Sequence, residues 1–483
     1  MPVRRHLAPC VCALVTVLSF IGTGRAGAAS APAEPNANAV DHQKVPQPKR
    51  LFIIAPDRFH AILADYVRHK PASLRTELVS LEQVLKTTEG ADDPERLKRF
   101  LYAAWRERDL GYVLLVGDVD VMPVRYMVLD RVTPAAFDYA FYPSDLYYAD
   151  LAKADGTFES WNARKDGFHA GYFGEVRGEK NKKDPINYDQ VNYRPTVAVG
   201  RWPVSTADEA RIVANKSIQY DEEVEKGTHP GMGKAAIFHP GGWIDARDQL
   251  GHVADALPRA WHCQMFFHDG AAADTAPNEG NLLAALNSGT GLIIHAGHGS
   301  EHTWEGCFPA PALGRVHNRD RLPVMISAGC STAYFAPLAP YDGYVDVAGK
   351  QHAGTYAGEV FTSPPPPPSP YQSGKYNPTG LGEQLLKRGP DGAVVYIGCC
   401  TGSQPCALSL VEGFTRSLRR TPHPRVGDCW ADAVRYYYQA EHLADLKPNA
   451  DWYPPSIFFQ GMKFMLFGDP SLPMAVAGHA SDH

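Results

Sequence analysis

The sequence has no excess of basic charge and no long apolar run. Its 483 residues include 47 Lys and Arg against 53 Asp and Glu, for a formal net charge of −6. A chain without a basic excess lacks the electrostatic field that draws proteins to nucleic acid, so we expect no nucleic-acid partner. A membrane-spanning helix needs about eighteen or more consecutive apolar residues, and no such run occurs, so we expect no membrane span.

Several common catalytic and metal-binding signatures are also absent. The sequence contains no HEXXH pair for zinc and no GxSxG turn for a nucleophilic serine. It has no EF-hand spacing for calcium and no internal repeat of about 20–50 residues. These absences argue against a zinc peptidase, a serine hydrolase of the α/β type and a repeat protein.

Residues 1–29 have the three-part pattern of a signal peptide. Arg4 and Arg5 provide a basic start, an apolar run follows at 10–21, and small residues occupy 26–30. The run is too short to cross a bilayer, and the alternative is a buried N-terminal helix. Cleavage is expected after Ala28 or Ala29, which predicts a secreted or periplasmic protein. Residues 30–48, rich in Ala, Pro, Asn and Gln, are interpreted as a flexible leader or pro-segment.

The cysteine count is odd once the signal peptide is removed. The chain has nine cysteines, and those beyond the signal are Cys263, Cys307, Cys330, Cys399, Cys400, Cys406 and Cys429. In an oxidising compartment an odd number leaves at least one thiol without an intramolecular disulfide partner. That thiol is a candidate for a reactive role.

The main part of the chain alternates between short apolar runs and segments of helical periodicity. Apolar runs at 51–56, 111–118, 291–300, 322–331 and 392–400 predict buried strands, and segments such as 94–109 and 205–225 predict helices. Near-continuous apolar strands separated by helices are typical of an α/β protein with parallel sheets. The alternation occurs in two rounds, and we expect an N-terminal α/β subdomain at 49–225 and a second one at 230–474.

One segment interrupts this alternation. Residues 336–378 lack periodicity and contain the run SPPPPPSP at 363–370, which favours polyproline II. A loop of this length inside a domain is usually a lid, a binding loop or a disordered insert. We expect it to contribute nothing to the core.

Two predicted strands end in glycine-rich turns that carry reactive side chains. The first turn holds His295, His298 and His302, and the second holds Cys330, 32 positions after His298. That separation suits one crossover between neighbouring parallel strands, whose carboxyl ends share one edge of the sheet. An imidazole beside a thiol can take its proton, and the backbone N–H groups near Gly299 and Gly329 could stabilise an oxyanion. The alternatives are a buried structural cysteine, a core or capping histidine, and a zinc site formed by the three histidines.

The sequence then shows a family resemblance along most of its length. The blocks that carry it are GYVLLVGDVDVMPV at 111–124, SDLYYADL at 144–151, VAVGRWPVST at 197–206, LNSGTGLIIHAGHGSEHTW at 286–304, LPVMISAGCS at 322–331, PTGLGEQLL at 378–386, GAVVYIGCCTGS at 392–403 and FMLFGDPSLPM at 464–474. In order and in content they resemble the gingipain-type cysteine peptidases, family C25 of the caspase-like clan.

This resemblance implies roles for particular residues. His298 would be the base and proton donor, Cys330 the nucleophile, and the N–H groups of Gly299 and Cys330 the oxyanion hole. The fold would be caspase-like, with two adjacent α/β subdomains of mainly parallel sheet, the second carrying the dyad. Substrates would be peptides or proteins cleaved through a thioester acyl-enzyme.

The chain also departs from the family pattern. Gly329 precedes the nucleophile where the family usually has Ala, and Pro240 stands where the family has a third, acidic catalytic residue. Asp245 or Asp248 could replace that acid, or one of them could line the substrate pocket as an acid does in the Arg-cleaving relatives. The stretch GSQPC at 402–406 occupies the place of a pocket wall that usually carries Trp.

No cofactor is required by the predicted chemistry, but calcium is a family feature. Oxygen ligands for it could come from an acid-rich stretch containing Asp145, Asp150, Asp155, Asp166 and Glu175. The competing interpretation is a solvated acidic loop, and the sequence identifies no metal site.

The favoured function is therefore an exported cysteine endopeptidase acting on peptide or protein substrates. Two alternatives remain open at this point. The first is a catalytically inactive C25-like protein with a binding or secretion-associated role, motivated by the missing acid. The second is an acyl or peptide transferase that uses the same thioester.

Overall fold

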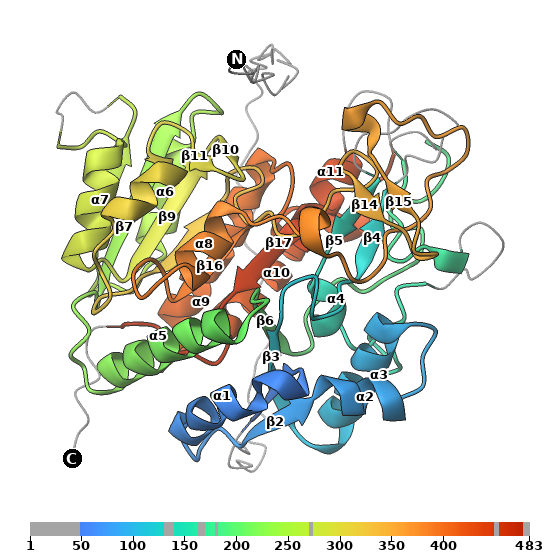
Figure 1. Cartoon of the computed structure of the whole chain (residues 1–483). Helices are drawn as coiled ribbons and strands as arrows, with labels where there is room; N and C mark the ends of the chain where they lie inside the picture. The colour runs from blue at the N-terminus through green and yellow to red at the C-terminus, as the bar shows by residue number, and fades with distance from the viewer. Residues whose placement is uncertain are drawn as a thin grey trace, which may run out of the picture. The chain divides into compact units, whose positions relative to one another are not determined.

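The computed structural model describes residues 49–129, 140–162, 170–178, 182–269, 274–448 and 454–476. The predicted signal peptide and the leader at 30–48 lie outside the described residues. Figure 1 shows the structure, in which the described residues begin at 49 and form the body of the protein. Among the residues that the structure describes, no helix is both long enough and apolar enough to span a membrane.

A ten-stranded, mostly parallel sheet organises this body. Its spatial order is β2-β1-β3-β6-β17-β16-β13-β9-β7-β8. The strands are β1 (Arg50–Ala55), β2 (Thr76–Ser80), β3 (Leu110–Val116), β6 (Ala198–Trp202), β7 (Lys234–Gly241), β8 (His262–Phe267), β9 (Leu292–Gly297), β13 (Val324–Ser327), β16 (Val395–Cys399) and β17 (Phe464–Phe467). Only the pairing of β16 with β17 is antiparallel. The predicted α/β class with a mainly parallel sheet is confirmed.

Helices cover both faces of the sheet because successive strand side chains point to opposite sides. Phe52 and Ile54 of β1 belong to one apolar core, and Leu51 and Ile53 belong to the other. The first core packs against α2 (Leu81–Thr87), α3 (Asp93–Glu107), α6 (Arg247–Asp255), α9 (Leu408–Arg420) and α10 (Val426–Ala440). The second packs against α1 (Asp57–His69), α5 (Ala207–Glu225), α7 (Glu279–Ser288) and α8 (Leu381–Lys387).

The remaining short elements lie outside this sheet. Four short strands form two antiparallel pairs, β4 (Tyr126–Val128) with β5 (Phe141–Pro143) and β14 (Tyr344–Val345) with β15 (Gln351–His352). A three-stranded hairpin sheet follows β9 and comprises β10 (Gly299–Ser300), β11 (Thr303–Trp304) and β12 (Phe308–Pro309). The short helices are α4 (Leu146–Ala149), α11 (Pro454–Phe458), η2 (Ala310–Arg315), η3 (Thr355–Ala357), η4 (Gly374–Tyr376), η5 (Pro405–Ala407), η6 (Leu443–Asp445) and η7 (Gln460–Lys463).

Helix ends follow the signals in the sequence. Thr206 caps α5 through a reciprocal capping box with Glu209, which satisfies two backbone donors at that terminus. Gly289 closes α7 in the left-handed conformation, at φ 84°. The α5 cap falls within the helical segment predicted at 205–225, and the helix ends where predicted, at residue 225.

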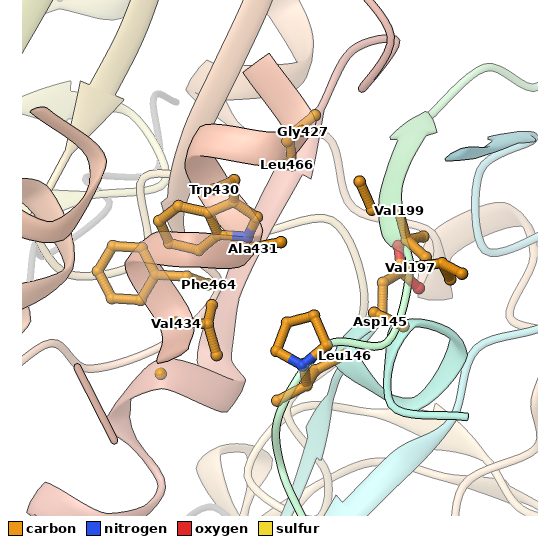
Figure 2. Close-up of a pocket in the computed structure, with 14 residues that line it drawn as sticks. Asp145, Leu146, Val197, Val199, Gly427, Trp430, Ala431, Val434, Phe464 and Leu466 are labelled. Atoms are coloured by element: carbon orange, nitrogen blue, oxygen red, sulfur yellow. The ribbon is translucent and has the colours of Figure 1, made fainter. Parts of the chain in front are cut away.

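The two rounds of alternation meet between β6 and β17. These strands share a single register pair, Phe467 with Arg201, so the sheet is weakly paired at this position. A cavity of about 30 Å³ lies beside it, between Val199 on one side and Trp430 and Phe464 on the other (Figure 2). That volume has room for about two water molecules, which is too little for a substrate. Strands of both rounds belong to this one sheet. The sheet therefore does not mark where one predicted subdomain ends at 225 and the other begins at 230, and these boundaries stay a prediction.

The segment at 336–378 differs from expectation. It was expected to contribute nothing to the core, yet Tyr344, Phe361 and Tyr376 are buried. The polyproline run itself is bonded through its carbonyls: Val124 N–H donates to Pro370 O at 3.0 Å. Proline lacks an N–H but retains its carbonyl, so a run without periodicity can still dock by accepting hydrogen bonds.

Candidate active site

His298 and Cys330 follow neighbouring strands, as the sequence predicts. β9 and β13 pair in parallel with His295 opposite Ser327, so their carboxyl ends lie at the same edge of the sheet. His298 comes directly after β9 and Cys330 three residues after β13. Both residues are half-buried. The crossover between the two strands is made of the β10–β12 hairpins and η2.

The two turns approach so closely that they need glycine. A Cβ on Gly299 would lie 3.4 Å from Cys330 N, 3.0 Å from Cys330 O and 2.6 Å from Thr332 Cγ2. A Cβ on Gly329 would lie 3.1 Å from Gly297 O and 3.3 Å from Gly299 Cα. The backbone next to the imidazole and the backbone of the nucleophile are therefore in contact.

The imidazole of His298 is oriented by a backbone carbonyl. Its Nε2 lies 2.8 Å from Gly242 O. A carbonyl only accepts, so Nε2 carries the proton and Nδ1 is the basic ring nitrogen. Gly241 and Gly242 have φ of 78° and 76°, in the region that favours glycine. This pair of left-handed residues turns the chain beyond β7 and presents the carbonyl to His298.

Two further histidines hold the strand ends in place. His239 donates from Nδ1 to Ala296 O at 2.7 Å, which ties the end of β7 to β9. His295 is buried and stacks on Trp304 at 4.6 Å between ring centroids, with its Nδ1 2.9 Å from Ser327 Oγ. Burial, with a smaller effect from the neighbouring His239 and His298, lowers the pKa of His295 to about 3. His295 is therefore a neutral packing residue.

The thiol of Cys330 contacts the loop that follows β16. Ser403 N–H donates to Cys330 Sγ at 3.3 Å, and the thiol donates back to Ser403 O at 3.7 Å. Ser331, the next residue, adopts φ 53°, which is uncommon for a residue with a side chain. Its N–H donates to Thr401 O at 2.8 Å, so the same loop also fixes the turn of the nucleophile.

The other cysteines are in different surroundings. The seven cysteines of the described residues form no disulfide. Burial raises the pKa of Cys263, Cys399 and Cys406 to about 11 and that of Cys307 and Cys429 to about 12. Burial also raises the pKa of Cys400. These thiols stay protonated near neutral pH. Cys330 differs from them in its contacts with the turn at Ser403.

The N–H of Gly299 points away from its hairpin partner. Glu305 N–H donates to His298 O at 3.0 Å, so these two residues form a hydrogen-bonded pair. Pairs alternate in an antiparallel ladder, which makes the next pair, Gly299 with Trp304, a non-hydrogen-bonded one. The Gly299 N–H is thus directed away from β11, and Gly299 lies beside the backbone of Cys330.

Comparison of the sequence with known protein families identifies a family. The sequence model of peptidase family C25 matches residues 44–475. The chain belongs to peptidase family C25. The resemblance stated from the sequence blocks is thereby confirmed.

Solved C25 structures share the fold. Gingipain R, an Arg-specific cysteine proteinase, superposes with a TM-score of 0.56 at 16% identity, covering 90% of this chain and 79% of that one. The complex of the pro- and mature domains of RgpB from Porphyromonas gingivalis gives 0.52 at 17% identity, covering 88% and 79%. These likenesses support the caspase-like α/β fold expected from the C25 resemblance.

A curated relative also matches by sequence. It is an uncharacterized protein of Archaeoglobus fulgidus, 20% identical over 299 residues. The match covers 55% of this chain and 62% of the relative. The chain thus spans less than two thirds of that relative's length.

Neither Asp245 nor Asp248, the acids considered as a replacement for the C25 carboxylate, bonds to His298 among the described residues. Asp245 is exposed and pairs with Arg247 at 2.5 Å, which lowers the pKa of Asp245. Asp248 is exposed in the first turn of α6. The contact that orients His298 comes from Gly242 instead. A role of Asp245 or Asp248 in the substrate pocket stays a prediction.

The acids considered for calcium do not converge. Asp166 lies outside the described residues, and each of the other four has protein partners. Asp145 bonds Arg201, Asp150 bonds Trp161 and Tyr193 N–H, Asp155 bonds Thr157, and Glu175 bonds Arg177. Within the described ranges, no group of three or more His, Cys, Asp or Glu side chains is arranged to hold a metal ion. That statement includes the three histidines considered for zinc, of which His302 is exposed.

Sequence reasoning missed the backbone partners of the dyad. Gly242 O and Ser403 N–H contact His298 and Cys330, but main-chain groups carry no residue-type signature. The available signals were indirect: consecutive glycines after β7, and a Gly-Ser turn after β16. Both turns follow strands whose carboxyl ends lie at the edge of the sheet that holds the dyad.

Proposed function

We propose that this C25 member is an exported cysteine endopeptidase that cleaves peptide bonds through a Cys330–His298 dyad. The observation that carries the proposal is the contact of the Gly299 and Cys330 backbones beside a histidine held by Gly242 O. A nucleophile, an oriented base and outward N–H groups in one place are the components of acyl transfer.

In the acylation step, Nδ1 of His298 takes the thiol proton and Cys330 Sγ attacks the carbonyl carbon of the scissile bond. The N–H groups of Gly299 and Cys330 stabilise the resulting oxyanion. When the tetrahedral intermediate collapses, the C–N bond breaks and the leaving amine takes the proton from His298. The acyl group remains on Sγ as a thioester.

Deacylation runs through the same groups. His298 takes a proton from water, the hydroxide oxygen attacks the thioester carbonyl, and the C–S bond breaks. Cys330 leaves as a thiolate and regains its proton from imidazolium. The Ser403 N–H next to Sγ favours the thiolate in both steps.

Hydrolysis of peptide substrates by the purified protein tests the proposal. Internally quenched peptides with Arg, Lys or norleucine at P1 would be compared, which tests the prediction that Asp245 or Asp248, just beyond the Gly242 turn, selects a basic P1. Matched arms with calcium and with a chelator test the calcium prediction. Cleavage that Cys330→Ala and His298→Ala both abolish supports the endopeptidase. A folded protein that cleaves none of the peptides contradicts it.

Export is part of the proposal and has its own test. Residues 1–29 carry the signal-peptide pattern, and cleavage is expected after Ala28 or Ala29. N-terminal sequencing of protein collected from the periplasm or the medium reads the cleavage site directly. Full-length protein retained in the cytoplasm would refute export.

A further inference from the structure

A pocket of about 300 Å³ lies beside the turn of the nucleophile. Ligand pockets in proteins begin at about this volume. One wall is Tyr334, four residues after Cys330, and another is formed by Lys375, Tyr376 and Pro378. The third includes Asp342 and His352, so that every lining residue except Tyr334 belongs to the 336–378 segment. The predicted substrate-pocket acids Asp245 and Asp248 do not line it.

Backbone hydrogen bonds connect the walls of the pocket to the turn of Cys330 and to the hairpin after His298. Tyr334 N–H donates to Ser331 O at 3.1 Å, within the turn that holds Cys330. Beyond Pro378 the chain reaches Leu381, whose N–H donates to Glu301 O at 2.9 Å in the hairpin that follows His298. An extended peptide advances about 3.3 Å per residue. A side chain a few residues from the scissile bond can therefore reach this pocket.

Asp342 gives the pocket its chemical character. Tyr334 Oη and Leu338 N–H both donate to its Oδ2, at 2.9 and 2.7 Å. Its Oδ1 has no hydrogen-bond partner in the part of the chain that the structure describes. A half-buried carboxylate oxygen in this state is a site for a donor, and a cation is the strongest one.

Other charged groups lie around Asp342. Burial, and to a smaller extent the charge of Glu301, raises the pKa of Asp342. His352 is held between two carboxylates, with Nδ1 2.8 Å from Glu359 and Nε2 3.0 Å from Asp346. Lys375 is an opposing positive charge at the exposed rim, where its Nζ lies 4.9 Å from the centre of the Tyr376 ring. Asp342 is thus the carboxylate that lines the pocket, and Glu359 and Asp346 are already bonded to His352.

We propose that this pocket is a second substrate subsite, which takes a lysine or arginine side chain of the bound peptide at a position other than P1. The cationic head bonds Asp342 Oδ1 while its alkyl stem packs on Tyr334 and Tyr376. This inference rests on the proposed endopeptidase function, because it assumes that a peptide lies across the dyad. It adds a specificity determinant, Asp342, that the 336–378 segment supplies.

Peptide binding tests the subsite without requiring hydrolysis. The probes are fluorescein-labelled Ala-based octapeptides with arginine at the fourth position and a single lysine at each other position in turn. Norleucine at the same position is the reference. Affinities are measured by fluorescence anisotropy on Cys330→Ala protein. At one position we expect lysine to bind at least tenfold tighter than norleucine.

Two variants with opposite expected effects attribute that preference to the pocket. Asp342→Asn keeps an oxygen acceptor for Tyr334 and Leu338 but removes the charge, so the lysine preference should disappear while norleucine binding is unchanged. Lys375→Met removes the opposing charge at an exposed position and should increase the preference. If Asp342→Asn destabilises the fold, Lys375→Met still decides.

The outcomes separate this proposal from the proposed function. A protein that hydrolyses peptides but shows no position where Asp342→Asn or Lys375→Met changes the lysine preference refutes the subsite alone. Binding with an Asp342-dependent lysine preference, in a protein whose native form hydrolyses nothing, supports the subsite and refutes the endopeptidase.

Discussion

Nε2 of His298 donates a hydrogen bond to the backbone oxygen of Gly242 at 2.8 Å. The proposed base is thus oriented by main-chain geometry rather than by an ionisable side chain, in line with the expectation that Pro240 replaces the acid of the C25 pattern. The position of the carbonyl depends on two consecutive left-handed glycines. We therefore expect the backbone conformation at residues 241–242 to affect the proposed activity.

Substitution of Gly242 should therefore damage activity more than folding. A Cβ there would meet His298 Cδ2 at an ordinary 3.5 Å, so the disturbance comes from the φ of 76°. Strain of about 1–2 kcal/mol moves the carbonyl away from Nε2. We expect Gly242→Ala to lower kcat/KM at least tenfold. Gly251→Ala, in α6 with no atom within 4 Å of the new Cβ, is the matched control. Equal activity of both variants would contradict the role of Gly242.

The contact of Gly299 with the nucleophile's turn predicts a rescue. Gly299→Ala places a Cβ 2.6 Å from Thr332 Cγ2 and should reduce activity about 100-fold by separating the two backbones. Thr332→Ser removes that methyl and keeps the hydroxyl. The double variant should therefore recover part of the loss, as measured in a double-mutant cycle. Purely additive losses would show that the close approach is not what requires glycine.

The N–H of Ser403 should influence the ionisation of Cys330. Ser403→Pro removes the donor that lies 3.3 Å from Sγ, whereas Ser403→Ala retains it. We expect the midpoint of the pH dependence of Cys330 alkylation by iodoacetamide to rise in the proline variant only. Mass spectrometry identifies the alkylated cysteine, and circular dichroism checks the fold. A common midpoint in both variants would remove Ser403 from the account.

Acid should destabilise the protein partly through His295. Its folded-state pKa of about 3 lies below the ordinary value, so between pH 6.5 and 3 the unfolded chain binds a proton that the folded one does not. Stability falls as pH drops through this window, by about 2 kcal/mol at pH 5 for this group. His295→Gln should lose stability at pH 7, where the Trp304 stack is removed, yet show a smaller further loss at pH 5. Urea unfolding at both pH values measures this, with the exposed His302→Gln as control. Identical losses on acidification in His295→Gln and the parent would contradict it.

The 336–378 segment should prove to be a stable part of the fold. Gln372 is buried, and its amide bonds Val345 N–H at 2.8 Å, Val345 O at 2.7 Å and Ser369 O at 3.0 Å. Gln372→Ala removes the partner of Val345 N–H and of Ser369 O, at about 1–3 kcal/mol for each group left buried and unsatisfied, whereas Val345 O keeps the bond from Ser369 N–H. We expect limited proteolysis to cut within 345–370 in Gln372→Ala and not in the exposed control Gln264→Ala. Equal resistance would show that the segment is held by other contacts.

The sequence predicted what depends on side-chain pattern. The apolar runs identified β1, β3, β9, β13 and β16, and the 32-residue separation of His298 and Cys330 predicted that β9 and β13 are neighbours, which is confirmed. Two elements were missed: β8, which is largely exposed at the edge of the sheet, and helix α9. The 336–378 segment was also misjudged, because docking through carbonyls leaves no hydrophobic period.

In the candidate site, too, the side chains could be predicted from the sequence and the main-chain contacts could not. Cys330 and His298 are reactive residue types in glycine-rich turns, and such turns can be recognised in a sequence. Gly242 O and Ser403 N–H are main-chain atoms, and their direction depends on local φ values and on the loops after β7 and β16. No residue-type rule reports such atoms. The pocket around Asp342 forms where distant parts of the 336–378 segment fold back onto Tyr334, and it is visible only in three dimensions.

Active-site labelling tests the dyad most directly. The purified mature protein would be treated with arginyl and lysyl chloromethyl ketones or acyloxymethyl ketones after reduction, with and without calcium, beside Cys330→Ala and His298→Ala. We predict a single adduct on Cys330, located by mass spectrometry, that is absent from Cys330→Ala and strongly reduced in His298→Ala. Equal labelling of Cys330→Ala, or no labelling of a folded protein by any of these reagents, would contradict the assignment of His298 and Cys330 as a catalytic pair.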